Sequence, residues 1–257
     1  MRIGIAGIAG RMGRLLSEEV TAAGATLAGG TVRPGSGKAS PPGALLLPDA
    51  AALFAASDVV IDFTHAEEAV PHATLAARAG KGLILGSSGL NAAQERAVAE
   101  AASGTPIVYA ANFSPGVNVV LALAERMAAL LPAAGYDAEI VEMHHRQKVD
   151  APSGTAVALG RAVARGRGTT LEAAGTESGR DGHVGARRTG AIGFAALRGG
   201  QVVGEHALLF AGATEHITLT HRSFDRRAYA TGAVRAALWL RGRPAGLYGM
   251  ADVLGVT

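Results

Sequence analysis

The residues best suited to chemistry lie near the middle of the chain, in a run that begins at Glu142 and ends at Thr155. The run holds two adjacent histidines, His144 and His145, followed shortly by Lys148. An imidazole can give or take a proton near neutral pH, and an ammonium group can hold an anion. We therefore interpret the run as a proton-delivering, anion-binding site.

Two alternatives compete with this interpretation. Each histidine could be a hydrogen-bonded structural group, because neighbouring residues on a strand point to opposite faces unless the strand ends there. The loop-forming residues from Arg146 to Lys148 indicate that the strand does end. A zinc site is disfavoured, since no third histidine or carboxylate stands at ligand spacing. We predict no metal site.

The run closes with Ser153, Gly154 and Thr155, a step that can open a helix. A helix start offers backbone N–H groups, and here also hydroxyls, to a carboxylate. Together with Lys148, these residues predict a site for a small, highly anionic, unsaturated substrate. Such a substrate would take up one proton beside one hydride.

A glycine-rich turn stands at the other place where chemistry is indicated, at the N-terminus. An apolar strand runs directly into Gly7, Gly10 and Gly13, and a helix pattern follows. The glycines could serve a tight turn alone. However, a strand–turn–helix with this spacing is typical of dinucleotide binding, where the helix start holds a pyrophosphate. Arg11 inside the turn could add a charge-assisted contact to a phosphate.

The choice between the two nicotinamide cofactors usually depends on the end of the second strand, where an acidic residue holds a ribose hydroxyl. Here Thr31, Val32 and Arg33 stand there, without a carboxylate. Both Arg33 and Arg11 could approach a 2′-phosphate. The sequence therefore predicts NADPH as the cofactor, with NADH possible.

Composition excludes several other classes of protein. The 257 residues contain no cysteine, which excludes disulfides and a cysteine nucleophile. A net charge of +3 and 4% aromatic residues count against nucleic-acid binding. No signal peptide and no uncharged stretch of about 18 apolar residues is evident. We expect a soluble, cytoplasmic protein that binds neither nucleic acid nor membrane.

The pattern of elements changes character in the middle of the chain. Short apolar runs alternate with helical patterns in the first part, which is the signature of a parallel sheet. The expected strands there are 3–6, 26–32, 59–63, 83–86 and 107–110, with helices at 10–23, 67–78 and 92–102 and a loop at 33–42. A helix at 119–131, a strand at 139–144 and a helix at 154–165 follow. Residues 166–188 are expected to form an excursion or lid.

Three β patterns come next, at 191–197, 202–210 and 216–220, before a last helix at 226–240. Because no helix separates them, we expect antiparallel neighbours. The predicted fold class is α/β, with a Rossmann-like parallel-sheet nucleotide-binding domain and an inserted α+β domain whose sheet is mixed and largely antiparallel. The predicted boundaries are 1–113 with 223–257 for the first domain and 114–222 for the second.

These residues resemble the 4-hydroxy-tetrahydrodipicolinate reductase (dihydrodipicolinate reductase) family of lysine and diaminopimelate biosynthesis. The run Glu142-x-His144-His145-x-x-Lys148-x-Asp150-Ala-Pro-Ser-Gly-Thr-Ala156 matches the family's central signature without a gap. The resemblance continues over Asp62-Phe-Thr64, Gly86-Ser-Ser-Gly89, Ala111-Asn-Phe-Ser114, Arg198-Gly-Gly-x-x-Val-Gly204-Glu205-His206 and the segment from Gly246 to Gly255.

The resemblance implies NAD(P)H-dependent reduction of a cyclic dicarboxylate and a role for each matching residue. It makes His144 the proton donor and acceptor and Lys148 a second proton donor, with His145, Gly154 and Thr155 binding substrate. It also implies hinge closure and self-association, commonly as a homotetramer. The implied cofactor contacts are Gly7, Ile8, Ala9, Gly10, Arg11, Met12, Gly86, Ser87, Ser88, Ala110, Ala111, Asn112 and Phe113.

This chain departs from the family at a few positions. Many members carry an acidic residue where Val32 stands, and His65-Ala66 replaces a usual x-Pro step. Two other functions remain open. Another two-domain oxidoreductase, such as an amino-acid or semialdehyde dehydrogenase, would share the glycine turn but not the central run. A nucleotide-sensing protein would have no need for His144, His145 and Lys148.

Overall fold

The computed structural model describes residues 1–256 except Pro34, Ser36 and Lys38. The chain divides into two compact units. The first unit comprises Met1–Pro115 and Arg226–Gly255, and the second comprises Gly116–Asp225. Part of the loop expected at 33–42 lies outside the described residues.

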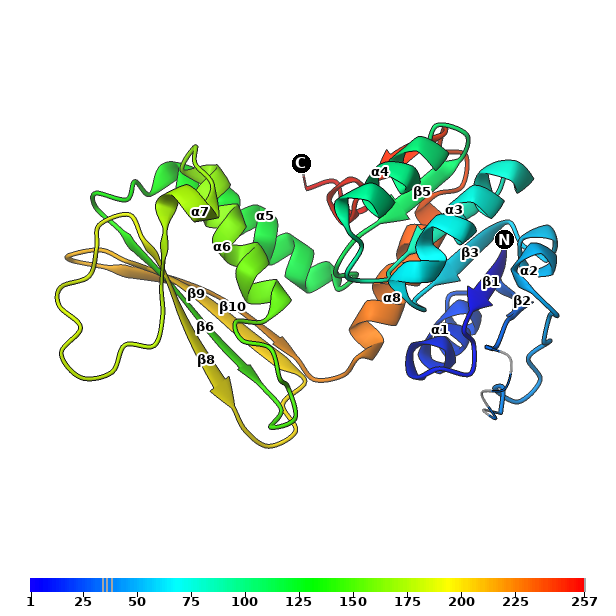
Figure 1. Ribbon diagram of the computed structural model, residues 1–257, viewed down its shortest axis with the longest axis horizontal. Coiled ribbons are helices and arrows are strands. Elements are labelled where there is room, and N and C mark those ends of the chain that lie inside the picture. Colours follow the sequence, from blue (N-terminus) through cyan, green and yellow to red (C-terminus); the bar gives the residue numbers. More distant parts are fainter. Residues whose placement is uncertain (34, 36, 38, 257) are drawn as a thin grey trace. The chain divides into compact units, whose positions relative to one another are not determined.

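The first unit is built on a six-stranded parallel sheet with the order β11-β5-β4-β3-β1-β2 (Figure 1). Its strands are β1 (Arg2–Ala6), β2 (Thr26–Gly30), β3 (Val59–Asp62), β4 (Gly82–Leu85), β5 (Pro106–Tyr109) and β11 (Gly246–Tyr248). Its helices are α1 (Arg11–Ala22), α2 (Ala50–Ala56), α3 (Ala66–Ala79), α4 (Ala92–Ala101), α8 (Arg227–Trp239) and α9 (Met250–Leu254).

Both faces of this sheet are covered, which explains why its strands read as continuous apolar runs. Ile3, Ile5 and Ile61 join a core with α1 and α8 on one face. Val60 and Leu83 join a second core with α2, α3 and α4 on the other. Hydrophobic burial on both faces holds the strands in place. The loops that follow their carboxyl ends, including the glycine turn after β1, lie at one edge of the sheet.

The second unit contains a mixed five-stranded sheet with the order β10-β9-β6-β8-β7. Its elements are α5 (Pro115–Leu130), β6 (Asp137–His144), α6 (Gly154–Gly166), α7 (Leu171–Ala174), β7 (Thr176–Glu177), β8 (Ile192–Arg198), β9 (Gly204–Ala211) and β10 (His216–Ser223). One face packs against α5, α6 and α7 around Ile140, Phe194, Leu208 and Phe210. The predicted fold class is confirmed.

One prediction about this sheet was wrong. The strands expected at 191–197 and 202–210, β8 and β9, are not neighbours, because β6 lies between them. β6 pairs in parallel with β8 and antiparallel with β9. The connection between β8 and β9 instead crosses the end of β6: Gly199 N–H donates to the His144 carbonyl at 2.9 Å, and His145 N–H donates to the Val202 carbonyl at 2.8 Å. Both sides of β6 are thereby occupied, and its end is held where the histidines stand.

Several short elements were not predicted, namely α2, α7, β7, β11 and α9. Two of them, α7 and β7, belong to the second unit and lie within residues 166–188, the segment expected to form an excursion. Ion pairs anchor this segment, since Arg180 and Arg187 both bind the Glu139 carboxylate of β6 at 2.7 to 2.9 Å. The second strand of the first unit ends at Gly30, so Thr31, Val32 and Arg33 lie beyond the strand.

Candidate functional site

The end of β6 brings a buried carboxylate and an imidazole together. Glu142 and His144 stand two residues apart on the strand and so share a face. Their side chains are 1% and 11% exposed, and His144 Nδ1 lies 2.6 Å from Glu142 Oε2. Because a carboxylate only accepts hydrogen bonds, Nδ1 carries a proton and Nε2 is the nitrogen left for chemistry.

Glu142 is also bound by two further groups. The Arg198 guanidinium of β8 donates to both of its oxygens at 2.8 Å, and Ser153 N–H donates to Oε1 at 3.1 Å. Burial raises the pKa of Glu142, but hydrogen bonds from Arg198 and His144 outweigh it and the pKa is lowered. The carboxylate therefore stays ionised and can stabilise an imidazolium on His144.

A second histidine, His206 of β9, lies against the first. Its ring centroid is 5.1 Å from that of His144, with the rings edge to face. Burial, followed by the charge of His144, lowers the pKa of His206 to about 4. His206 is thus neutral near pH 7, and its Nε2 lies 2.9 Å from the Ser153 hydroxyl.

The main chain of β9 approaches the reactive nitrogen of His144 closely at Gly204. A Cβ atom placed on Gly204 of β9 would lie 3.0 Å from Nε2. Because glycine has no side chain, this side of the imidazole is not covered by Gly204. His144 is 9% exposed as a residue, which suits a group that meets a ligand and is otherwise shielded.

The predicted carboxylate cradle follows β6 directly. Lys148 Nζ donates to Asp150 Oδ1 at 2.8 Å, and this bond is the main cause that lowers the pKa of Asp150. Gly154 is exposed, and a Cβ atom there would meet nothing within 4 Å. Thr155 is half-buried in the first turn of α6. Among the described residues, His145 Nδ1 is buried with no hydrogen-bond partner, so it can accept or donate a further bond.

Ser153 differs from the other cradle residues, because its polar groups are already engaged. It is 2% exposed and caps α6, where its hydroxyl accepts from Ala156 N–H at 3.2 Å. Its N–H binds Glu142 and its hydroxyl meets His206. The geometry favours a role for Ser153 in holding the start of α6 and the buried carboxylate together.

The glycine turn of the first unit has the form that a dinucleotide requires. Gly7 has a φ of 71°, and a Cβ atom on Gly13 would collide with the Gly7 carbonyl and lie 2.6 Å from Ile8 Cα. The helix α1 therefore begins directly against the turn, with Gly10 extended at its N-cap. The first N–H groups of a helix have no partner inside it, and they face the pyrophosphate in folds of this kind.

Two further predicted cofactor segments follow neighbouring strands at the same edge of the sheet. Gly86, Ser87 and Ser88 come after β4, and Ala110 to Phe113 come after β5. Ser87 Oγ is buried and, among the described residues, has no hydrogen-bond partner. An unpaired buried hydroxyl at the carboxyl edge of the sheet is suited to a polar contact with a dinucleotide. Arg11 and Arg33 are both exposed.

Glu142, Arg198 and His206 were not predicted as site residues, although all three lie in the motifs that resemble those of the family. Glu142 could have been paired with His144 from the alternation of β6 alone. The contacts of Arg198 and His206 depend on the order of strands, which local pattern does not give. These three residues complete the buried part of the site.

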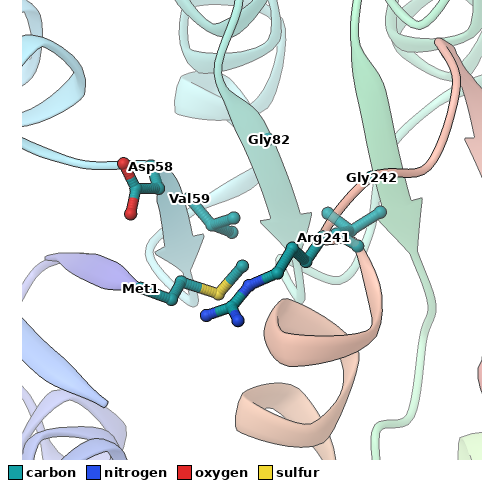
Figure 2. Close-up of a pocket in the computed structure, with 7 residues that line it drawn as sticks. Met1, Asp58, Val59, Gly82, Arg241 and Gly242 are labelled. Atoms are coloured by element: carbon teal, nitrogen blue, oxygen red, sulfur yellow. The ribbon is translucent and has the colours of Figure 1, made fainter.

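A separate hollow in the first unit lies at the opposite edge of the sheet (Figure 2). It is lined by Met1, Asp58, Val59, Gly82, Leu240, Arg241 and Gly242. Asp58 precedes β3 and Gly82 begins β4, so the hollow is at the amino ends of these strands. It is therefore distinct from the carboxyl-end loops that carry the glycine turn.

Two features are absent from the described residues. These residues contain no group of three histidine, cysteine, aspartate or glutamate side chains arranged to hold a metal ion. None of their helices is both long and apolar enough to cross a membrane.

Comparisons with known proteins agree over the whole chain. Residues 1–113 match the family model for the N-terminus of dihydrodipicolinate reductase, and residues 116–254 match that for its C-terminus. The chain is 64% identical to the 4-hydroxy-tetrahydrodipicolinate reductase of Granulibacter bethesdensis, covering 100% of this chain and 97% of the relative. It is 61% identical to that of Gluconacetobacter diazotrophicus, covering 100% and 98%.

Solved structures share the fold. A dipicolinate-bound dihydrodipicolinate reductase from Paenisporosarcina sp. TG-14 is similar with a TM-score of 0.78 and 23% identity, over 99% of both chains. GenD2 from gentamicin A biosynthesis, in complex with NAD, has a TM-score of 0.64 at 18% identity, over 100% of this chain and 90% of that one. The chain therefore belongs to the dihydrodipicolinate reductase family and is an oxidoreductase of lysine biosynthesis that reduces 4-hydroxy-tetrahydrodipicolinate with a nicotinamide dinucleotide.

Proposed function

We propose that His144 delivers the proton of this reduction and that Glu142 keeps it in the reactive form. The observation that carries the proposal is the buried Glu142 carboxylate, shared by His144, Arg198 and Ser153 at the end of β6. With Nδ1 held by the carboxylate, Nε2 is the atom that gives its proton to the substrate. When bound, the nicotinamide supplies the hydride.

Lys148, His145, Gly154 and Thr155 form the cradle for the substrate's carboxylates in this proposal. Lys148 is already charge-paired with Asp150, so a second carboxylate would share or replace that partner. The α6 N-terminus offers N–H groups next to the exposed Gly154. Ser153 contributes by fixing this helix start, and Lys148 can add a second proton source.

Three segments of the first unit hold the cofactor in this proposal, and NADPH is the better donor. The segments are Gly7 to Met12, Gly86 to Ser88 and Ala110 to Phe113, with Arg33 near the adenosine. Val32 is half-buried in the turn after β2 and supplies no carboxylate for a ribose hydroxyl. The exposed Arg11 and Arg33 are free of a nearby acid in sequence and suit a 2′-phosphate.

The second unit is also proposed to build a homotetramer, in a cytoplasmic enzyme. The sheet face opposite its core carries Val141, Met143, Ala195 and Leu197. Val141 is 39% and Leu197 51% exposed, and a continuous apolar sheet face of this kind is usually covered by a partner. Sedimentation analysis tests the tetramer directly, and a monomer at micromolar concentration would contradict it.

A crystal complex with pyridine-2,6-dicarboxylate, a planar mimic of the substrate, tests the site. We expect its carboxylates on Lys148, Gly154 and Thr155, with its ring near His144 Nε2. A mimic bound away from these residues would exclude the proposed cradle.

A further inference from the structure

A buried histidine–carboxylate pair in the first unit is not part of the sites described so far. Asp62 is the last residue of β3 and is 0% exposed, and His72 of α3 is 6% exposed. His72 Nδ1 is 2.7 Å from Asp62 Oδ2. Burying a carboxylate is costly unless it is paired and hydrogen-bonded, so a pair maintained at this position calls for an explanation.

The position of Asp62 in the sheet is the first indication. In the strand register, Asp62 stands between Ala6 of β1 and Leu85 of β4. The residues that follow those two are Gly7 and Gly86, which open two of the proposed cofactor segments. Asp62 therefore stands, along the sheet, between two of the proposed cofactor segments.

The second oxygen of Asp62 holds the segment that follows it. Oδ1 accepts from Thr64 N–H at 2.7 Å and from the Thr64 hydroxyl at 2.6 Å. The Thr64 methyl in turn lies under the glycine turn, because a Cβ atom on Gly7 would be 3.0 Å from Thr64 Cγ2. The Asp62 carboxylate therefore fixes the position of Thr64, whose methyl group packs against the glycine turn at Gly7.

Phe63, between these two residues, contacts the other cofactor segments. A Cβ atom on Gly86 would lie 2.5 Å from the Phe63 ring, so the ring packs directly against that glycine. Its centroid is 5.3 Å from that of Phe113. Residues 62–64 thus touch all three proposed cofactor segments.

His72 completes the arrangement from α3. The Phe54 ring of α2 lies 6.2 Å away, and Glu68 stands one turn earlier on the same helix. Burial lowers the pKa of His72, but the hydrogen bond and charge of Asp62, with a contribution from Glu68, outweigh burial and raise it. The imidazole of His72 ties α3 to the carboxylate that holds Thr64.

We propose that the Asp62–His72 pair positions the proposed cofactor segments. The pair holds Phe63 and Thr64 against Gly7 and Gly86 and thereby sets cofactor affinity. This inference rests on the proposed binding of the cofactor at the glycine turn. His72 acts through Asp62 and is a positioning residue.

The test compares His72→Leu with His72→Asn, whose amide nitrogen can replace Nδ1 as a donor. The Kd for NADPH is measured from its fluorescence in the absence of substrate, together with kcat and KM. We expect His72→Leu to raise the Kd and the KM for NADPH at least tenfold while kcat at saturation stays within about threefold. The Kd of His72→Asn for NADPH should lie within threefold of that of the parent.

His183→Leu, at an exposed loop histidine of the second unit, is the control and should leave the Kd unchanged. If His72→Leu does not fold, Thr64→Val, which keeps the methyl group and loses the hydroxyl, should raise the Kd at least threefold. A Kd within twofold of the parent in the folded variants, with only thermal stability lowered, would reduce the pair to a structural role and overturn the inference. A parent that does not bind NADPH would instead refute the proposed cofactor site.

Discussion

Replacing Glu142 by glutamine removes the charge at the centre of the buried site while keeping the shape of the side chain. The parent carboxylate accepts from His144 Nδ1, from two nitrogens of Arg198 and from Ser153 N–H. A glutamine amide offers one oxygen and one NH₂ group, so two of these four donors would face another donor. Arg198 would also lose its charge partner.

The expected loss of stability follows from the burial of Glu142. Glu142 is 1% exposed, and removing one partner of a buried pair costs about 3–5 kcal/mol. Because the amide keeps one acceptor, we expect Glu142→Gln to lower the free energy of unfolding by about 3 kcal/mol. Loss of the imidazolium's partner should lower kcat by about 10²-fold, the lower end of what a general acid contributes.

The assay is steady-state oxidation of NADPH with freshly made cyclic substrate, at a temperature where the variant is folded. Glu139→Gln is the matched control, because it makes the same change on the same strand at a partly exposed residue that pairs with Arg180 and Arg187. We expect its kcat within about twofold of the parent. A folded Glu142→Gln enzyme with kcat within about twofold of the parent would refute the role given to this carboxylate.

Three further predictions concern other residues of the two units. The pKa of His206 is about 4 in the folded protein and 6.5 in the unfolded chain. Between these pH values the unfolded state binds more protons, so the free energy of unfolding falls as the pH drops from 6.5 to 4. The loss of unfolding free energy should approach about 3 kcal/mol. When unfolding free energies are measured in urea from pH 7 to 4, His206→Gln should show a weaker pH dependence than the parent, and parallel curves for the two proteins would contradict this. Lys148→Ala should raise the substrate KM and lower kcat, and a change in neither would remove Lys148 from the cradle. NADPH should exceed NADH in kcat/KM by roughly fivefold to a hundredfold, less at high salt, and Val32→Glu should reverse the preference; a parent that prefers NADH would show that the turn was misinterpreted.

The sequence predicted those features that local pattern determines. Continuous apolar runs indicated β1, β3, β4 and β5, because strands buried on both faces carry that pattern. The glycine turn and the central histidine run were placed at strand ends, as the structure has them. Local signals failed for α2, whose seven residues are mostly alanine and show no periodicity, and for the three-residue strand β11.

The remaining differences arise from contacts between distant residues. Nothing in the pattern of β8 and β9 shows that β6 lies between them, because strand order depends on pairing across the whole unit. The bonds from Arg198 to Glu142 and from His206 to Ser153 follow from that order. Ser153 was assigned to the substrate for its hydroxyl and its place at a helix start, and the structure shows that its hydroxyl and N–H are already bound.

The most direct test of the account is the turnover of His144→Gln, measured together with the Kd for NADPH. We expect a kcat lower by about 10²–10⁴-fold, because a general acid contributes that much to a proton transfer. The Kd for NADPH should stay within about twofold of the parent, since the glycine turn belongs to the first unit and His144 to the second. A kcat within about twofold of the parent would show that His144 is not the proton donor.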